Sequence, residues 1–158
     1  MTDGEEWTQA TLTYLVDDGE VLLIEKKRGH GEGNFNGPGG KVEENETPKE
    51  AAVREFEEET KVEVEGLEKV AELKFFFGGD LDQHVHVYMT ENYEGEAEET
   101  EEARPEWFNI DEIPYDQMWP DDKIWMPKMF DGETFEGVFR FTEDGSEIKR
   151  YEIEEASF

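Results

Sequence analysis

Two kinds of hydrophobic spacing alternate along this chain, and their order constrains the fold more than any other feature of the sequence. Residues 11–16 and 21–26 alternate in the manner of strands on either side of an Asp-Gly turn, which predicts an antiparallel hairpin. Further strand-like runs occur at residues 63–77, 84–90, 107–110, 135–141 and 148–153. Because these runs lie before, between and after two helical segments, we predict an α/β sandwich around a mixed β-sheet.

The helical segments are identified by the residues that open them. In the first, Thr47 suits the N-cap, Pro48 suits the first helical position and Glu50 completes a capping box. This helix is predicted to run to about Lys61. A second helix is expected to begin near residues 120–122.

Two segments show neither kind of spacing. Residues 28–41 are so rich in glycine that we expect a shaped loop instead of regular structure, and loops of this kind often carry function. Residues 91–102 contain many acidic side chains and little to bury, so we expect an acidic surface loop there.

The chain is strongly acidic. Its 158 residues include 44 Asp and Glu against 15 Lys and Arg, which gives a formal net charge of −29. Because that charge repels nucleic acid backbones and anionic membranes, we expect neither duplex nucleic acid nor a membrane as a partner. Aromatic residues make up 13% of the chain, which favours a folded protein over a disordered one. We therefore expect a surface adapted to concentrated salt, as in halophilic proteins.

Length and the first residues predict a simple organisation. We place a single domain at residues 8–156, after an acidic tail at residues 1–7. The chain has no cysteine, which excludes disulfides and thiolate metal sites. Its start lacks the basic and apolar regions of a signal peptide, and no apolar run approaches the length of a membrane span. We therefore expect a cytoplasmic, monomeric protein.

Three glutamates of the predicted first helix share one face. Because positions i, i+3 and i+4 of a helix are neighbours, Glu55, Glu58 and Glu59 project together, while Ala52 and Phe56 turn toward a core. Such like charges cost stability unless a cation neutralises them, and oxygen ligands suit Mg²⁺, with Mn²⁺ as an alternative. In so acidic a chain, the same glutamates could instead form a solvated face adapted to salt.

The residues around these glutamates resemble the signature motif of a known family. The pattern is Gly40, five residues, Glu46, seven residues, and then Arg54, Glu55, Phe56, Glu57, Glu58, Glu59, Thr60, Lys61 and Val62. It resembles the Nudix box, which has glycine where this chain has Lys61. The resemblance implies the Nudix fold, an α/β/α sandwich, and favours metal binding over a solvated face. At the one departure, we expect a slightly different helix end and an intact metal site.

The Nudix resemblance also implies a role for each polar residue of the motif. The three helix glutamates would bind the metal ions, together with the backbone carbonyl of Gly39. Arg54 would hold the carboxylates in place, and Glu46 would steady the loop or that arginine. Either Glu59 or a loop glutamate would take the proton from the attacking water. Glu102 would be a further metal ligand, with the preceding glutamate as the alternative.

Outside the motif, the resemblance is closest to the Nudix hydrolases of oxidised purine nucleoside triphosphates. The matching stretches are residues 26–29, 36–41, 85–87, 102–105 and 119–122. The resemblance implies that Trp119 stacks on the purine, that Asp121 and Asp122 contact its edge and that Asn36 hydrogen-bonds it. Two adjacent, half-buried carboxylates cannot both ionise cheaply, so one of them would stay protonated. From their position alone, the two aspartates are better explained as helix caps.

The other residues implied to contact the substrate are Thr11, Lys26, Pro38, Gly39, Gly40, Lys41 and Pro120. Thr11 and Lys26 would line the base pocket, although both could be ordinary strand residues. His30 stands where this subgroup has phenylalanine, and Phe35 where it has tryptophan. We therefore expect a pocket floor of different polarity and shape.

Taken together, the resemblance implies Mg²⁺-dependent hydrolysis of nucleoside triphosphates such as 8-oxo-dGTP and 2-hydroxy-dATP to the monophosphate and pyrophosphate, which would cleanse the nucleotide pool. One alternative is a Nudix diphosphatase for ordinary nucleoside triphosphates, ADP-ribose or dinucleoside polyphosphates. Another is a non-catalytic nucleotide-binding module. Such a module would be expected to lack some of the motif glutamates, and none is missing.

Two further groups of residues have a structural explanation. His84 and His86 are two residues apart and would share one strand face, a spacing that could seat a transition metal. With no third ligand nearby, we expect them to be satisfied structural residues. Trp107 and Trp125 are expected in the core.

Overall fold

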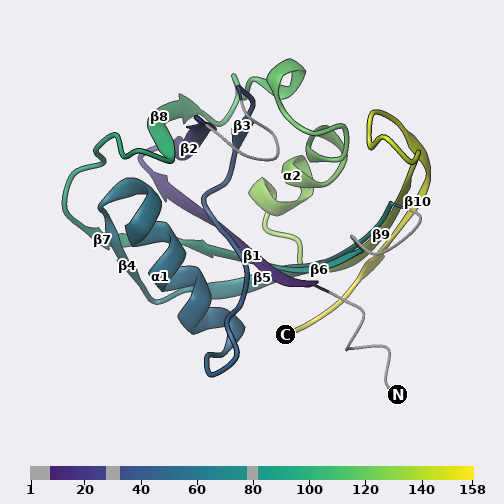
Figure 1. Cartoon of the computed structure of the whole chain (residues 1–158), viewed down its shortest axis with the longest axis horizontal. Helices are drawn as coiled ribbons and strands as arrows, with labels where there is room; N and C mark the ends of the chain where they lie inside the picture. The colour runs from purple at the N-terminus through teal and green to yellow at the C-terminus, as the bar shows by residue number, and fades with distance from the viewer. Residues whose placement is uncertain (1–7, 28–32, 78–81) are drawn as a thin grey trace.

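A computed structural model describes residues 8–27, 33–77 and 82–158 (Figure 1). The expected acidic tail at residues 1–7 and His30 lie outside the described residues. The strands are β1 (Thr8–Asp17), β2 (Glu20–Lys26), β3 (Phe35–Asn36), β4 (Glu63–Glu65), β5 (Glu68–Phe76), β6 (Gln83–Thr90), β7 (Asn92–Glu94), β8 (Ala103–Asn109), β9 (Phe135–Phe141) and β10 (Ile148–Glu155). The helices are α1 (Pro48–Thr60), the short 3₁₀ helix η2 (Tyr115–Gln117) and α2 (Asp122–Phe130). Across the described ranges, no helix is long and apolar enough to cross a membrane.

The larger sheet is mixed, as predicted. Its strand order is β10-β9-β5-β6-β1-β2-β3, with β8 also paired to β2. The pairs β1–β6 and β5–β9 are parallel, and the others are antiparallel. Each parallel pair is joined by a long connection that contains one of the α-helices, since parallel neighbours need a crossover. The predicted hairpin of β1 and β2 is present.

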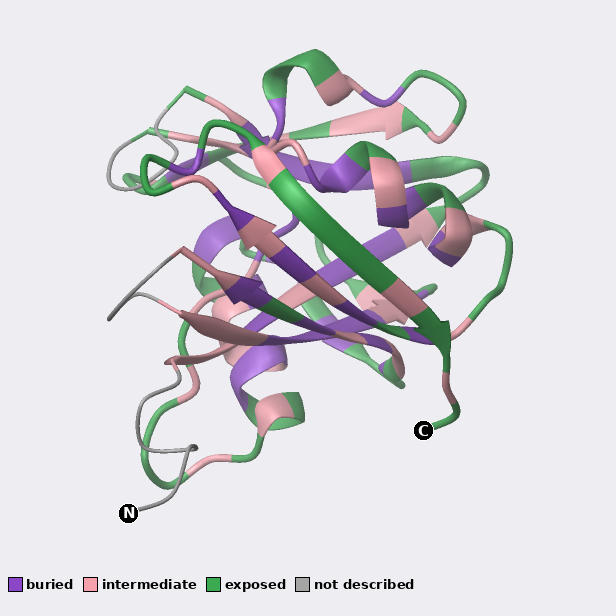
Figure 2. Ribbon diagram, turned by 90° about the vertical axis from the view of Figure 1, so that its right-hand side faces the viewer, coloured by how far each residue is buried: buried purple, intermediate pink, exposed green. Residues whose placement is uncertain are grey.

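The two α-helices cover opposite faces of this sheet, which gives the expected α/β/α layers (Figure 1). On one face, Phe56 of α1 packs in a core with Leu22, and the partly buried Trp107 lies against it. On the other face, Trp125 of α2 packs in a core with Leu23. Because adjacent strand residues point to opposite faces, β2 contributes to both cores and its residues 21–24 are all buried. In Figure 2, buried residues (purple) lie along the strands and helices, and exposed residues (green) lie in loops and along one long strand at the front.

Helix α1 begins as predicted and ends with a residue in the left-handed conformation. The Thr47 hydroxyl accepts a hydrogen bond from the Glu50 N–H at 3.1 Å, and Glu50 Oε1 accepts one from the Thr47 N–H at 2.8 Å, which completes the capping box. At the other end, Lys61 has a φ of 67° and donates its N–H to the Glu57 carbonyl at 2.8 Å. Lysine thus adopts the left-handed conformation that glycine favours, and the different helix end that we expected is not found.

Two loops contain more regular structure than the sequence predicted. Within the expected acidic loop, β7 pairs with β4 in a separate two-stranded sheet, in which Val64 lies opposite Tyr93. These two side chains pack with the core under α1, so a short apolar contact outweighs the acidic composition of the segment. The glycine-rich loop contains β3, and Gly66, with a φ of 66°, divides the run predicted at residues 63–77 into two strands.

Candidate active site

Part of the glycine-rich loop runs beside β1 and presents its backbone to α1. Two N–H groups of β1 donate to the carbonyls of Pro38 and Gly40, at 2.8 and 2.9 Å. The Gly39 N–H donates to Glu59 Oε1 at 2.8 Å. The backbone of Gly39 is therefore turned toward the carboxylates of the helix.

This approach of loop and helix requires glycine at two positions. A Cβ atom on Gly40 would lie 1.6 Å from Glu55 Oε2, and one on Gly39 would lie 1.8 Å from the backbone oxygen of Thr11. The second clash is with backbone, so no side-chain rotation relieves it. Glycine is needed here for space and not for an unusual φ, because neither residue has a positive φ.

Arg54 ties the loop to the helix. Its Nε and Nη2 donate to the two oxygens of Glu46 at 3.1 and 2.6 Å, and its Nη1 donates to both oxygens of Glu58 at 3.1 Å. Nη2 also donates to the carbonyl of Lys41 at 3.2 Å. Glu46 accepts from the Glu43 N–H at 2.9 Å as well, so it contacts both the loop and the arginine. Such bidentate pairs fix a guanidinium in both position and plane.

Glutamates from two elements surround a polar cavity. Glu55 and Glu59 of α1, Glu102 before β8, Lys26 of β2 and residues 39–41 line a space of about 320 Å³. Most of these residues come together only because α1 packs against the strands. The arrangement concentrates carboxylate oxygens with a single side-chain cation from the strands, Lys26, and one from the loop.

The crowding of these carboxylates changes their proton affinity. Burial, and next the charge of Glu58, raise the pKa of Glu55 to about 7, although the charge of Arg54 acts in the opposite direction. Burial likewise raises the pKa of Glu59 to about 8, against the hydrogen bond from Gly39. Glu58 is 48% exposed and does not line the cavity. Lys26 and Arg54 lower these pKa values only in part, and the oxygen donors of the cluster match the preference of a hard divalent cation.

A second cavity, mostly apolar in character, adjoins the first. It has a volume of about 310 Å³, within the range of small-ligand sites, and shares Lys26, Glu59 and residues 39–41 with the polar cavity. Of the residues predicted to contact substrate, it is lined by Thr11, Lys26, Asn36, Gly39, Gly40, Lys41, Trp119, Asp121 and Asp122. Pro38 and Pro120 are not lining residues, so the structure brings together all but these two.

Asp121 and Asp122 are buried in this cavity wall, at 4% and 5% exposure. Asp121 occupies the N-cap position of α2 but makes no capping bond; its Oδ2 accepts from Trp125 Nε1 at 2.8 Å. The capping explanation is therefore wrong for Asp121. Burial raises the pKa of Asp121 to about 6, and burial with the charge of Asp121 raises the pKa of Asp122 well above its usual value. Two adjacent carboxyl groups buried in one wall cannot both ionise cheaply, so the pair holds a proton to higher pH than an exposed aspartate would.

The sequence did not reveal the aromatic wall of the second cavity. Phe75, Phe77 and Phe141 line it, and the rings of Phe77 and Phe141 stack at a centroid distance of 5.0 Å and an interplanar angle of 17°. These residues belong to strand patterns that indicate only a core. The consecutive phenylalanines at residues 75–77 were the available signal.

Phe35 does not form the pocket floor. It is 7% exposed and packs edge-to-face on Phe108, with ring centroids 5.0 Å apart and an interplanar angle of 81°. It is absent from the lining of both cavities. The expectation that Phe35 changes the floor is therefore wrong, because β3 pairs with β2 and turns this ring into the core.

Known proteins are similar to this chain in sequence and in fold. A family model described as the NUDIX domain matches residues 7–129. The chain is 48% identical over 132 residues to an oxidized purine nucleoside triphosphate hydrolase of Danio rerio (83% of this chain, 85% of the relative), and 40% identical over 146 residues to one of Mus musculus (92% and 93%). The crystal structure of a mutator MutT protein from Bacillus halodurans matches with a TM-score of 0.80 at 28% identity, covering 93% of this chain and 97% of that one. This chain belongs to the Nudix family of hydrolases.

Proposed function

We propose that this Nudix hydrolase cleaves oxidised purine nucleoside triphosphates to the monophosphate and pyrophosphate, and so cleanses the nucleotide pool. Two adjoining cavities support this proposal, one rich in carboxylates and one with aromatic walls and a pair of aspartates. Their shared residues would let one ligand extend from a base pocket to a polyphosphate site. The relatives from Danio rerio and Mus musculus are named for the same activity.

Nudix enzymes use divalent metal ions, and we propose Mg²⁺, or Mn²⁺, for this chain. Glu55, Glu58, Glu59 and Glu102, with the carbonyl of Gly39, would hold it, because hard cations prefer oxygen ligands. The raised pKa values of Glu55 and Glu59 support the fit, since a bound dication would favour the ionised form of both carboxyl groups. When bound, such an ion neutralises phosphate oxygens and makes water more acidic.

The protein's own residues would orient the groups that react. Arg54 would hold Glu58 in place while Glu46 fixes Arg54 from the other side. Glu59 receives the Gly39 N–H on Oε1, which leaves Oε2 to accept the proton of the attacking water. Lys26 lines both cavities and would place its positive charge beside the phosphates.

In the base pocket, Trp119 would stack on the purine and the aspartates would contact its edge. The pair would share one proton, so that one carboxyl group would donate to the base and the other would accept from it. Donor and acceptor side by side would match a purine edge that presents the complementary pair. Asn36 of β3 also lines this pocket, and its side-chain amide would hydrogen-bond the purine.

A panel of substrates tests this proposal. Purified protein in MgCl₂ at high salt is given dGTP, 8-oxo-dGTP, 2-hydroxy-dATP and ADP-ribose, and the products are separated by chromatography. We expect both oxidised nucleotides to be cleaved with higher kcat/KM than dGTP. Cleavage of ADP-ribose alone would contradict the base-pocket assignment, and no cleavage of any of them would contradict the enzymatic proposal.

The proposed base is tested by a matched pair of variants on one helix. Glu59→Gln keeps an oxygen for the Gly39 N–H but removes the proton acceptor, so kcat is expected to fall by about 10²–10⁴-fold. Glu57→Gln changes an exposed glutamate of the same helix and is the control. Equal kcat values for the two variants would show that Glu59 has no part in the chemistry.

A further inference from the structure

A second group of possible metal ligands lies on β5 and β6. In their antiparallel pairing, Glu72 is opposite His86, and His84 lies two residues before His86 on the same sheet face. Val85, between the histidines, lines the base pocket, so this group occupies the other face of the sheet. Glu72 is the third ligand that the sequence alone did not place near the histidines.

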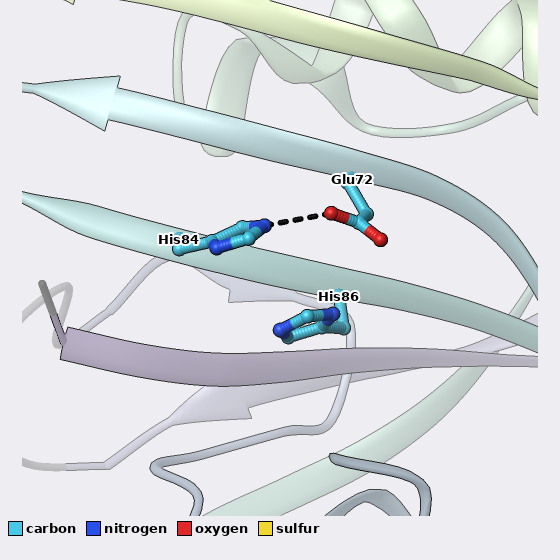
Figure 3. Close-up of side chains that lie close together, drawn as sticks. All are labelled: Glu72, His84 and His86. Atoms are coloured by element: carbon cyan, nitrogen blue, oxygen red, sulfur yellow. Dashed lines mark hydrogen bonds and ion pairs between the residues drawn. The ribbon is translucent and has the colours of Figure 1, made fainter. Parts of the chain in front are cut away.

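The three side chains converge (Figure 3). Glu72 Oε1 lies 2.8 Å from His84 Nε2, and the two imidazoles stack with centroids 4.6 Å apart and an interplanar angle of 28°. One potential ligand atom from each residue lies within 4.8 Å of the others. A tetrahedral ion with bonds of about 2.0–2.1 Å needs ligand atoms about 3.3 Å apart, so modest side-chain rotations would close the site.

His86 has a nitrogen that nothing else uses. This residue is 6% exposed, and its Nδ1 is buried without a hydrogen-bond partner among the described residues. The His86 Nε2 lies 2.8 Å from Gln9 Oε1. Because an amide oxygen can only accept a hydrogen bond, the ring proton is on Nε2, and Nδ1 carries a lone pair. A buried polar atom without a partner is costly, and a metal-bound histidine commonly donates its other N–H to a carbonyl in this way.

We propose that Glu72, His84 and His86 form a binding site for a transition-metal dication of the Zn²⁺ type, separate from the carboxylate cavity. Two imidazoles and one carboxylate are a usual protein set for such an ion and leave a fourth position open to water. His84 would bind through Nε2, so the proton that now lies between this nitrogen and Glu72 Oε1 would move to Nδ1, which is 3.5 Å from the amide nitrogen of Gln9.

Nearby charges both favour and oppose the binding of a dication at this site. Burial, followed by the charges of Lys69 and His84, lowers the pKa of His86 to about 4, so its ring is neutral and ready to bind at pH 7. Lys69 forms an ion pair with Glu72 at 2.5 Å, but through Oε2, which leaves Oε1 for the metal. The ammonium nevertheless repels a dication, and the net charge of −29 attracts one. Lys69 should therefore weaken the site without blocking it.

Zinc binding to the intact protein tests the proposal. ZnCl₂ is titrated calorimetrically in excess MgCl₂, which occupies the carboxylate cavity, and the chain's three histidines are followed by NMR. We expect one Zn²⁺ equivalent and shifts of the His84 and His86 ring signals but not of His30. The NMR arm needs no variant, so the test does not depend on a mutant that folds.

Variants with opposite expected effects sharpen the test. Glu72→Gln and His84→Gln should weaken Zn²⁺ binding at least about 100-fold, Gln9→Ala about 10–100-fold, and Lys69→Gln should strengthen it. Glu68→Gln removes an exposed carboxylate from the same strand and should leave the affinity unchanged. Equal affinity in wild type, Glu72→Gln and His84→Gln would overturn the proposal. Loss of the Zn²⁺ equivalent in Glu55→Gln alone would assign the ion to the carboxylate cavity and overturn the proposal as well.

Discussion

Single carboxyl groups in this protein differ because of what surrounds each of them. Glu46 lies beside Arg54, and the hydrogen bond from that guanidinium lowers the pKa of Glu46. Burial raises the pKa of Glu59 to about 8, against the hydrogen bond from Gly39 and the charge of Lys26, and burial also raises the pKa of Asp122. The same functional group thus has a lowered proton affinity beside Arg54 and a raised proton affinity where it is buried.

The pair of buried aspartates makes the stability of the protein depend on pH. Their folded-state pKa values lie above the unfolded value of about 3.9, so the folded state binds more protons and stability falls as pH rises from about 4 through about 6, the pKa of Asp121. Asp122→Asn removes one of these groups while keeping an oxygen for the Trp119 N–H. Relative to wild type, the variant should therefore gain free energy of unfolding between pH 4.5 and pH 7.5.

Urea unfolding of the metal-free protein at both pH values measures this gain. The exposed Asp116→Asn variant is the control, and it should follow wild type at each pH. If Asp122→Asn also followed wild type, the proton held by the aspartate pair and its role as a donor to the base would be contradicted.

Among the secondary structure elements, α1 determines the geometry of the site. Its capping box fixes where the helix begins, and the contacts of Arg54 fix the loop against it. Its buried face, with Phe56, sets the rotation of the helix about its axis, so that Glu55 and Glu59 face the loop. The positions of the proposed metal ligands therefore depend on how tightly this one helix packs against the sheet.

The end of α1 contains avoidable strain. Lys61 holds a φ of 67°, a conformation that costs a residue with a Cβ atom about 1–2 kcal/mol. Lys61→Gly should therefore be more stable than Lys61→Ala by about 1 kcal/mol, since both variants lose the same charge and differ only in the Cβ atom. Thermal and urea unfolding of the two variants give the comparison. A Gly variant no more stable than the Ala variant would show that the helix end is not strained.

For the whole molecule, charge is the dominant property. Forty-four acidic side chains in a chain of 158 residues repel one another, and the described ion pairs engage only a small part of them. Burial of two cores, one on each face of the sheet, must outweigh this repulsion. Screening should therefore change the stability of this protein more than that of a neutral one.

Added salt should stabilise the protein. At about 1 M the screening length falls to about 3 Å, so repulsion between surface carboxylates is largely removed and Tm should rise on adding molar KCl. The gain should shrink at pH 4, where many carboxylates are protonated, which separates screening from other effects of the salt. A Tm that stays constant from low to molar KCl at pH 7 would contradict adaptation of this surface to salt.

The sequence by itself determined the features that depend on neighbours along the chain. The cap of α1, the hairpin of β1 and β2, and the spacing that places Glu55 and Glu59 on one face follow from helix and strand periods, and the structure has all of them. The tertiary structure decided what depends on strand pairing between distant segments. It put Phe75 beside Phe141 and turned Phe35 into the core. It also placed Glu72 against the two histidines, because register across a sheet is set by packing of the whole chain and leaves no local mark in the sequence.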